Sequence, residues 1–141
     1  MLIQNIKLAA DALVFNRTEQ GLQLLLIKRG NEPNKGMWAF PGGFVEDDEE
    51  LETAALRELE EETGVKLTAM KQAHTFGKVG RDPRGRTVSV TYYAFTDAAL
   101  HNIAGADDAA DAQWVYLSDI TEMAFDHLEC LQTVLREHNI N

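Results

Sequence analysis

Residues 46–62 hold ten acidic side chains and one basic side chain, Arg57. This segment contributes −9 to the formal net charge of −10, so the other 124 of the 141 residues sum to −1. Like charges at this density destabilise a fold unless cations neutralise them. The acidity therefore belongs to one site, and a duplex nucleic-acid partner, which needs a basic face, is disfavoured.

The acidic segment also has the apolar periodicity of a helix, predicted over residues 48–62. With about 100° per residue, Leu51 and Leu59 mark the stripe that faces a core, and Glu58 and Glu62 fall inside that stripe. A glutamate-rich helix is usually a solvent-exposed surface, but that interpretation does not account for these two carboxylates. Buried carboxylates without partners are unfavourable, so the pair requires a cation, and a hard divalent ion with oxygen ligands suits it.

The turn Pro41-Gly42-Gly43 precedes this helix. Because the two glycines lack a Cβ atom, the backbone can approach a ligand closely, and its carbonyl oxygens can complete the shell of a magnesium ion. A tight turn that only reverses the chain is the alternative. Gly64 is expected to end the helix at the usual C-terminal position.

Strand-like segments alternate with two helix-like segments along the chain. This order indicates a sheet sandwiched between helices, and the length favours a single domain over residues 1–141. Asp126 with Glu129 forms a capping-box pattern at the start of the last helix. The expected strands are residues 6–16, 22–29, 65–79, 86–96 and 113–117, and the expected last helix is residues 126–138.

The composition is typical of a soluble protein. Hydrophobic residues make up 45% of the chain, which is enough for a core. No apolar run is long enough to cross a bilayer, and no signal peptide is visible. The single cysteine, Cys130, excludes an internal disulfide and is expected to be a small buried hydrophobe. We expect a cytoplasmic location and no membrane partner.

Residues 43–65 resemble the Nudix box, the signature of the Nudix hydrolase family. Gly43 is followed after five residues by Glu49, and after seven more by Arg57-Glu58-Leu59-Glu60-Glu61-Glu62-Thr63-Gly64-Val65. The match covers every specified position, and the length and order of elements are similar over essentially the whole chain. The resemblance implies an α/β/α sandwich with a mixed sheet, in which the box forms a catalytic loop–helix–loop.

The resemblance also implies roles for individual residues of the box. Three carboxylates and one backbone carbonyl would bind Mg²⁺ or Mn²⁺, namely those of Glu58, Glu61, Glu62 and Gly43. Arg57 would hold a glutamate by an ion pair, and Glu49 would brace the box. The catalytic set that the family implies is Glu49, Arg57, Glu58, Glu61 and Glu62.

Looser patterns resemble the ADP-ribose pyrophosphatase-like branch of the family. They are the arginine-rich loop and strand at residues 80–90, the motif Ala124-Phe125-Asp126-His127, and Asp107-Asp108-Ala109 ahead of Trp114. The branch includes transcriptional regulators that carry a winged helix-turn-helix, a module for which we expect no room after Asn141. The resemblance further suggests a homodimer.

The reaction implied by the family is attack of water on one phosphorus of a nucleoside diphosphate linked to another group. With ADP-ribose the products would be AMP and ribose 5-phosphate. Two alternatives stay open: a nucleoside triphosphate pyrophosphohydrolase and a non-catalytic sensor that binds ADP-ribose. The box binds the pyrophosphate and not the flanking groups, so it does not separate the substrates, whereas its intact glutamates disfavour the sensor.

The phosphates of a small-molecule nucleotide substrate need basic partners. Arg81 and Arg84 in the loop after residue 79, and Arg29 at the end of the second expected strand, are the candidates, since guanidinium forks suit phosphate oxygens. The backbone of Gly42 and Gly43 is expected to contribute to substrate binding as well. A loop arginine taken alone is more often just an exposed residue.

The general base that activates water has two candidate locations. It is either Glu61 in the box or an acid on a later loop. Between Thr63 and Ser118 the acids are all aspartates, and Asp107 or Asp108 is the candidate there, with a solvated turn as the alternative. His127 is assigned a capping or packing role and no catalysis.

Overall fold

Strand β1 (Lys7–Thr18) is the centre of the sheet, because its residues 9–16 are all buried. A strand covered on both faces has to be apolar along nearly its whole length, as this one is. It pairs in parallel with β6 (Thr87–Phe95) and in antiparallel fashion with β2 (Gly21–Arg29) and β4 (Gly42–Phe44). The computed structural model describes residues 3–103 and 109–141.

Seven strands of the described residues form one mixed sheet. Its main path runs β3–β2–β1–β6–β5, and β4 pairs with β1 while β7 pairs with β2. The other strands are β3 (Trp38–Ala39), β5 (Lys71–Phe76) and β7 (Ala109–Tyr116). Single 3₁₀ turns lie at Ala98–Leu100 and Leu117–Asp119.

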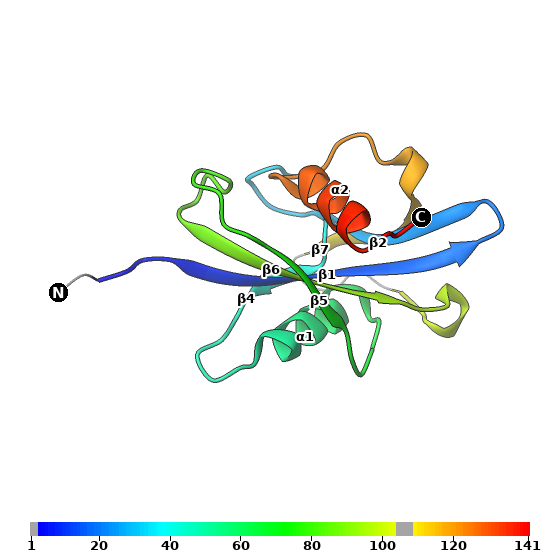
Figure 1. The fold of residues 1–141 in the computed structure, drawn as a ribbon, viewed down its shortest axis with the longest axis horizontal. Helices are drawn as coiled ribbons and strands as arrows, with labels where there is room; N and C mark the ends of the chain where they lie inside the picture. The colour runs from blue at the N-terminus through cyan, green and yellow to red at the C-terminus, as the bar shows by residue number, and fades with distance from the viewer. Residues whose placement is uncertain (1–2, 104–108) are drawn as a thin grey trace.

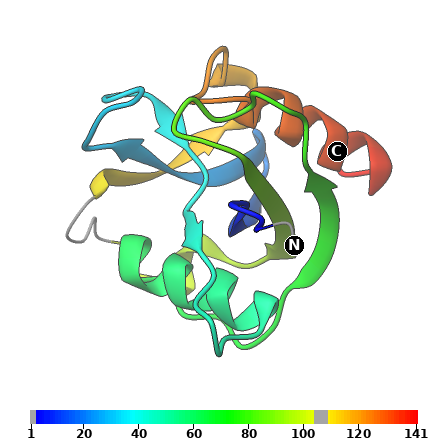
Figure 2. The same cartoon turned by 90° about the vertical axis from the view of Figure 1, so that its left-hand side faces the viewer.

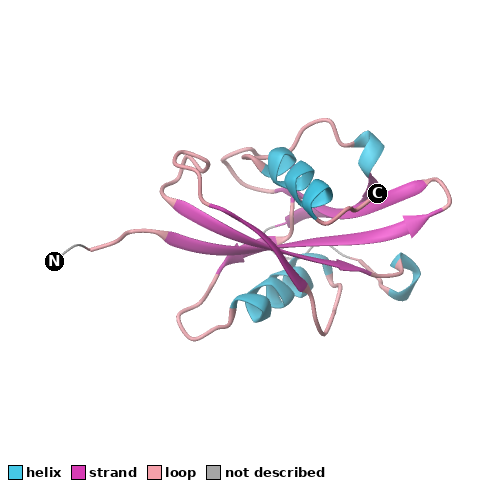
Figure 3. Ribbon diagram, viewed as in Figure 1, coloured by secondary structure: helices cyan, strands magenta, loops and turns pink. Residues whose placement is uncertain are grey.

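Helices α1 (Leu51–Thr63) and α2 (His127–Glu137) cover opposite faces of the sheet (Figures 1 and 2). Alternation along β1 separates two cores, since Ala12 and Val14 pack on the α1 side while Leu13 and Phe15 pack on the α2 side. Figure 3 shows the resulting order of helix, sheet and helix. The predicted α/β/α sandwich with a mixed sheet is confirmed.

Several boundaries differ from the prediction where long-range pairing decides them. Residues 38–39 and 42–44, predicted as loop, are short strands because β2 and β1 offer them hydrogen-bonding edges. The strand predicted at residues 113–117 begins earlier, since β7 pairs with β2 as far as Arg29. The strand predicted at residues 65–79 is shorter, because β5 spans only Lys71–Phe76, the segment that pairs with β6. The helix predicted from residue 48 begins at Leu51, because Glu50 before it is extended.

The two helix ends that the sequence singled out behave differently. Gly64 ends α1 as predicted, with a left-handed φ of 80° and its N–H donating to the Glu60 carbonyl at 2.9 Å. The capping box predicted for α2 is wrong, because the Asp126 side chain makes no cap hydrogen bond. Its carboxylate accepts from Arg81 instead.

With 13 residues in α1 and 11 in α2, no helix among the described residues is long and apolar enough to span a membrane.

Candidate active site

Strand β4 runs between two carboxyl groups. Gly42 lies opposite Asp11 of β1, and Gly43 lies opposite Ala10. A Cβ atom on Gly43 would stand 2.7 Å from Cδ of Glu58, and a Cβ atom on Gly42 would collide with Oδ1 of Asp11. Because successive residues of a strand face opposite sides, the glycine pair admits one carboxyl group to each face. This explains the two glycines by geometry.

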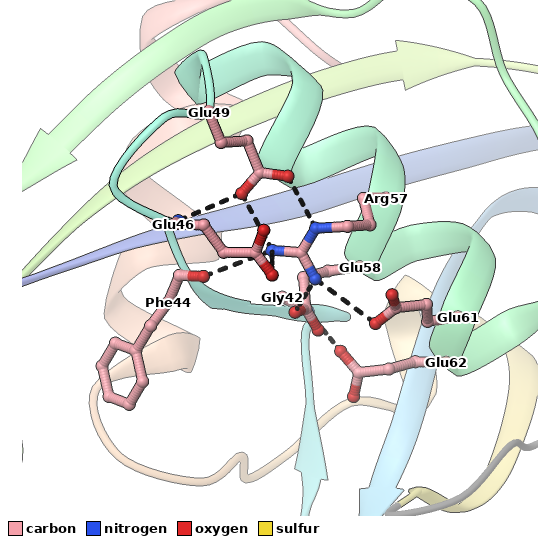
Figure 4. Close-up of polar contacts among 8 residues, drawn as sticks. All are labelled: Gly42, Phe44, Glu46, Glu49, Arg57, Glu58, Glu61 and Glu62. Carbon is pink, nitrogen blue, oxygen red and sulfur yellow. Dashed lines mark hydrogen bonds and ion pairs between the residues drawn. The ribbon is translucent and has the colours of Figure 1, made fainter.

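Arg57 joins the loop before α1 to the helix itself. Its Nε donates to Oε2 of Glu49 at 2.6 Å, and its Nη2 donates to Oε1 of the same carboxylate at 2.9 Å (Figure 4). These bonds hold the pKa of Glu49 below its usual value. Glu49 also accepts from the N–H of Glu46 at 3.1 Å. The loop is thereby closed onto the first turns of the helix, and Nη1 of Arg57 is left to face Glu58 at 2.7 Å.

The three glutamates implied as metal ligands differ in exposure. The side chain of Glu58 is 17% exposed, whereas that of Glu61 is 58% exposed. Glu62 is half-buried, and its Oε1 accepts from the N–H of Gly42 at 2.8 Å (Figure 4). Burial raises the pKa of Glu62 well above its usual value, and the Glu58 carboxylate beside it raises this pKa further. This part of the site therefore carries more negative charge than its surroundings stabilise.

A hard divalent cation fits this donor set. The oxygens come from carboxylates and a glycine backbone, which are the ligands that Mg²⁺ prefers. Arg57 is shared between Glu58 and Glu61, so its single positive charge does not balance the cluster. In the described part of the chain, no three acidic, histidine or cysteine side chains lie close enough together to hold one metal ion. Glu58 and Glu61 both accept a hydrogen bond from Nη1 of Arg57 (Figure 4).

Two adjoining cavities open beside the glutamates. The larger, about 490 Å³, is lined by Glu58, Glu61 and Glu62 together with Arg29 and Arg84. The smaller, about 130 Å³, reaches the α2 side of the sheet, where Phe125 and His127 line it. Its wall is formed by Asp11, Arg29, Phe40, Gly42, Gly43, Phe44, Glu62, Arg81, Asp82, Arg84, Ser89, Phe125 and His127, among others. Acidic and basic side chains thus line both of these adjoining cavities.

The three candidate arginines are placed differently. Arg29, at the end of β2, and Arg84, in the loop between β5 and β6, line both cavities. Arg81 lines only the smaller one, and its side chain is 4% exposed. Its guanidinium forks onto Asp126 at 2.9 and 2.8 Å and donates to Oγ of Ser89 at 2.7 Å. Most of its hydrogen-bonding capacity is therefore used within the protein.

Asp11 is a site residue that the sequence reasoning missed. It is 6% exposed, and burial raises its pKa to about 7, while Arg81 lowers this pKa and the carboxylates of Asp126 and Glu58 raise it. Its signal in the sequence is a lone acid within the apolar run of residues 8–15. A polar residue at a core position of a strand is unusual enough to deserve a functional hypothesis.

His127 is a packing residue. Its Nδ1 accepts from the N–H of Phe40 at 3.2 Å, and its ring stacks on the Phe40 ring at 4.5 Å between centroids. Burial lowers the pKa of His127 to about 3, so its ring is neutral. Asp107 and Asp108, the candidates for a loop base, lie outside the described residues.

A family model described as the NUDIX domain matches residues 6–134. The chain belongs to the Nudix family. It is 35% identical over 131 residues to the ADP-ribose pyrophosphatase of Methanocaldococcus jannaschii. The matched region covers 93% of this chain and 74% of that relative. The predicted family and its ADP-ribose pyrophosphatase-like branch are confirmed.

Two further proteins are similar to this chain over nearly its whole length. The ADPR responsive transcriptional repressor NtrR of Acinetobacter baylyi is 35% identical over 136 residues, 94% of this chain. The chain spans about half of that repressor, 54% of its length. The NUDIX domain of Shewanella oneidensis NrtR, solved as a cocrystal with ADP ribose, superposes with a TM-score of 0.87 at 34% identity, covering 97% of this chain and 90% of that one.

Proposed function

We propose that this Nudix protein is a pyrophosphohydrolase that uses Mg²⁺ or Mn²⁺ to cleave ADP-ribose into AMP and ribose 5-phosphate. The observation that carries the proposal is the hollow where Glu58, Glu61 and Glu62 face Arg29 and Arg84. A pyrophosphate bound to divalent cations has both negative oxygens and positive metal ions, so it matches a site with both kinds of side chain.

We propose ADP-ribose as the substrate because of the proteins that this chain resembles. A curated ADP-ribose pyrophosphatase resembles this chain over 93% of its length, and the Shewanella domain was crystallised with ADP ribose. The concentration of acidic charge at residues 46–62 also supports a small-molecule ligand and no nucleic-acid partner for this domain.

Glu58, Glu61, Glu62 and the carbonyl of Gly43 would hold the cation. When bound, the cation neutralises phosphate oxygens and lowers the pKa of a coordinated water. Arg57 orients Glu58 through the 2.7 Å bond of its Nη1, and Glu49 holds Arg57 in turn. Arg29 and Arg84 would receive the phosphate oxygens, and positioning with electrostatic stabilisation supplies most of the acceleration in such reactions.

Glu61 is our proposal for the general base. It is the most exposed carboxylate of the three and lines the larger cavity, where it can reach a water molecule. Its partner Arg57 lies 3.3 Å away, which leaves Glu61 less firmly held than Glu58. Because Glu61 would also hold the cation, the test is made at saturating Mg²⁺: there, Glu61→Gln will retain most of its kcat if a loop aspartate is the base instead.

A sensor for ADP-ribose is the second candidate, because the similar Acinetobacter protein is an ADPR-responsive repressor. A nucleoside triphosphate pyrophosphohydrolase is the third. An activity panel with Mg²⁺ separates them: ADP-ribose, NADH, nucleoside triphosphates and diadenosine polyphosphates, scored for AMP and phosphate release. We expect AMP release from ADP-ribose. Tight ADP-ribose binding without turnover of any compound would establish the sensor.

The variant that tests the site itself is Glu58→Gln, which keeps the shape of the side chain and removes its charge. We expect kcat to fall about 10³-fold while the circular dichroism spectrum stays that of the wild type, because the carboxylate orients the cation. Glu60→Gln, on the exposed side of the same helix, should keep the wild-type rate. Retention of most of the rate by Glu58→Gln would refute the assignment of the site.

A further inference from the structure

The ring of Phe125 lies against two arginine side chains from separate parts of the chain. Cζ of Arg29 lies 4.9 Å from the ring centroid, and Cζ of Arg84 lies 5.1 Å from it. Arg84 also lies 5.8 Å from the centroid of Phe44. Contacts of this kind favour one orientation of a mobile guanidinium over the others. Phe125 therefore brings together two cations that the sequence separates.

The backbone of Phe125 is held in an unusual conformation. Its φ is +52°, a region that bulky residues rarely adopt. The neighbouring residues are all anchored: the N–H of Ala124 donates to the Trp38 carbonyl at 2.8 Å, Asp126 binds Arg81, and His127 binds Phe40. Strained conformations persist where the surroundings over-determine them, and they cluster at ligand sites. The direction of the ring is thus imposed by the fold.

Both arginines have side-chain N–H groups that make no hydrogen bond to a described residue. Within the described residues, Arg29 makes its side-chain hydrogen bond through Nε, to the Pro33 carbonyl at 2.7 Å. Arg84 uses Nε and Nη2 on Asp82, at 3.1 and 2.9 Å. The two Nη groups of Arg29 and Nη1 of Arg84 are left for a ligand, and both side chains line the cavity that Glu58 and Glu62 also line.

The two guanidiniums also repel each other. Burial lowers the pKa of Arg29, and the charge of Arg84 lowers this pKa further, while Asp82, Glu62 and Glu32 oppose the change. Two cations held together in a partly buried hollow favour an anion between them, and guanidinium forks match phosphate oxygens. The ligand class that fits is a phosphoryl group.

We propose that Phe125 is a positioning residue that aligns Arg29 and Arg84 to bind the phosphoryl group of the substrate remote from the metal-binding glutamates. The inference rests on the proposed function, since it concerns the second phosphate of the same pyrophosphate. It assigns one phosphoryl group to the glutamates with their cation and the other to the arginines. Binding through the arginines then needs no metal.

The test uses Phe125→Leu, which keeps an apolar side chain and removes the aromatic face. We expect the Kd for ADP-ribose, measured by calorimetry in EDTA, and the KM with Mg²⁺ to rise about tenfold, while kcat changes less than about threefold. Phe95→Leu is the matched control, because Arg17 lies 5.0 Å from the Phe95 ring far from the site. It should leave Kd and KM unchanged.

A second comparison separates positioning from direct contact. In the background Arg29→Gln with Arg84→Gln, the further change Phe125→Leu should alter KM less than about twofold, because no guanidinium remains to be aligned. A full tenfold effect in that background would show that the ring itself contacts the ligand, and it would overturn the positioning role.

The outcomes distinguish this inference from the proposed function. Wild-type hydrolysis with an unchanged Kd and KM in Phe125→Leu overturns the inference alone. Metal-free binding that is weakened in Phe125→Leu supports it even if no compound is hydrolysed. Should Phe125→Leu fail to fold, Arg84→Gln, whose parent side chain is 43% exposed, replaces it with Arg17→Gln as control. An unchanged metal-free Kd in Arg84→Gln then overturns the inference.

Discussion

Gly42 and Gly43 have different neighbours, so the same substitution should have different effects. Gly43→Ala meets the flexible end of Glu58, whereas Gly42→Ala meets the backbone, with the Ala10 carbonyl oxygen at 2.7 Å and Cα of Asp11 at 2.9 Å. We expect Gly43→Ala to lower kcat about 100-fold by displacing Glu58, with little change in stability. Gly42→Ala should lower the free energy of unfolding by about 1–3 kcal/mol.

Urea unfolding and steady-state kinetics on both variants check this prediction. Equal stability losses in the two variants, with kcat retained in Gly43→Ala, would contradict it.

His127 makes stability depend on pH. Its pKa is lowered to about 3 in the folded state, against an ordinary value of about 6.5. Between these values the unfolded chain binds a proton that the folded chain does not, so this contribution is complete above pH 6.5 and is lost as the pH falls toward 3. From pH 7 to pH 5 the loss amounts to about 2 kcal/mol.

The variant His127→Gln should lack this loss. The difference in unfolding free energy between wild type and variant, measured in urea at pH 7 and pH 5, isolates it from Asp11 and Glu62, whose raised pKa values act in the opposite direction. A difference that does not change with pH would mean that His127 is not buried as a neutral ring.

At the scale of elements, α2 makes a polar side-chain contact with the rest of the fold near each end. Asp126 forms an ion pair with Arg81 at its start, and Glu137 forms a hydrogen bond with His74 near its end at 2.9 Å. The Arg81 side chain is 4% exposed, whereas His74 and Glu137 are 39% and 43% exposed. Burial makes the first pair far more sensitive to the loss of one partner.

We expect Asp126→Asn to lower the free energy of unfolding by about 3 kcal/mol, because it leaves a buried guanidinium without its countercharge. Glu137→Gln, the exposed counterpart, should change it by less than about 1 kcal/mol. Denaturant unfolding at pH 7 compares the two directly. Equal, small effects would show that Arg81 finds another partner.

At the scale of the whole molecule, the fold concentrates charge that the unfolded chain spreads out. The glutamates of α1 and the Gly43 carbonyl come together through the pairing of β4 with β1, so a divalent cation should bind the folded state far more tightly than the unfolded one. At about 100 times its Kd, such a ligand stabilises by about 2.7 kcal/mol.

Thermal unfolding should therefore shift to higher temperature with Mg²⁺ and return with EDTA. NaCl at matched ionic strength controls for general screening, and Glu58→Gln combined with Glu62→Gln should lose most of the shift. An equal rise with NaCl and with Mg²⁺ would contradict a specific site.

The sequence by itself determined the features that depend on local geometry. The facing of Glu58 and Glu62, the end of α1 at Gly64 and the spacing of the box follow from a helical period that neighbouring residues set. These features agree with the structure, as do the existence and order of the two helices and the five longer strands, although the bounds of β5 and β7 differ from the prediction. Strands as short as β3 and β4, rich in glycine or next to proline, have no periodicity of their own to reveal them.

The tertiary structure decided which residues from distant segments meet. Asp11 lies beside Gly42, Arg81 binds Asp126 45 positions away, and Phe125 stands beneath Arg29 and Arg84. Asp126 does not cap α2 as predicted for the same reason, since its carboxylate forms an ion pair with the buried side chain of Arg81. Strand register and helix docking set these contacts, and both depend on the packing of the whole core, which no local pattern in the chain encodes.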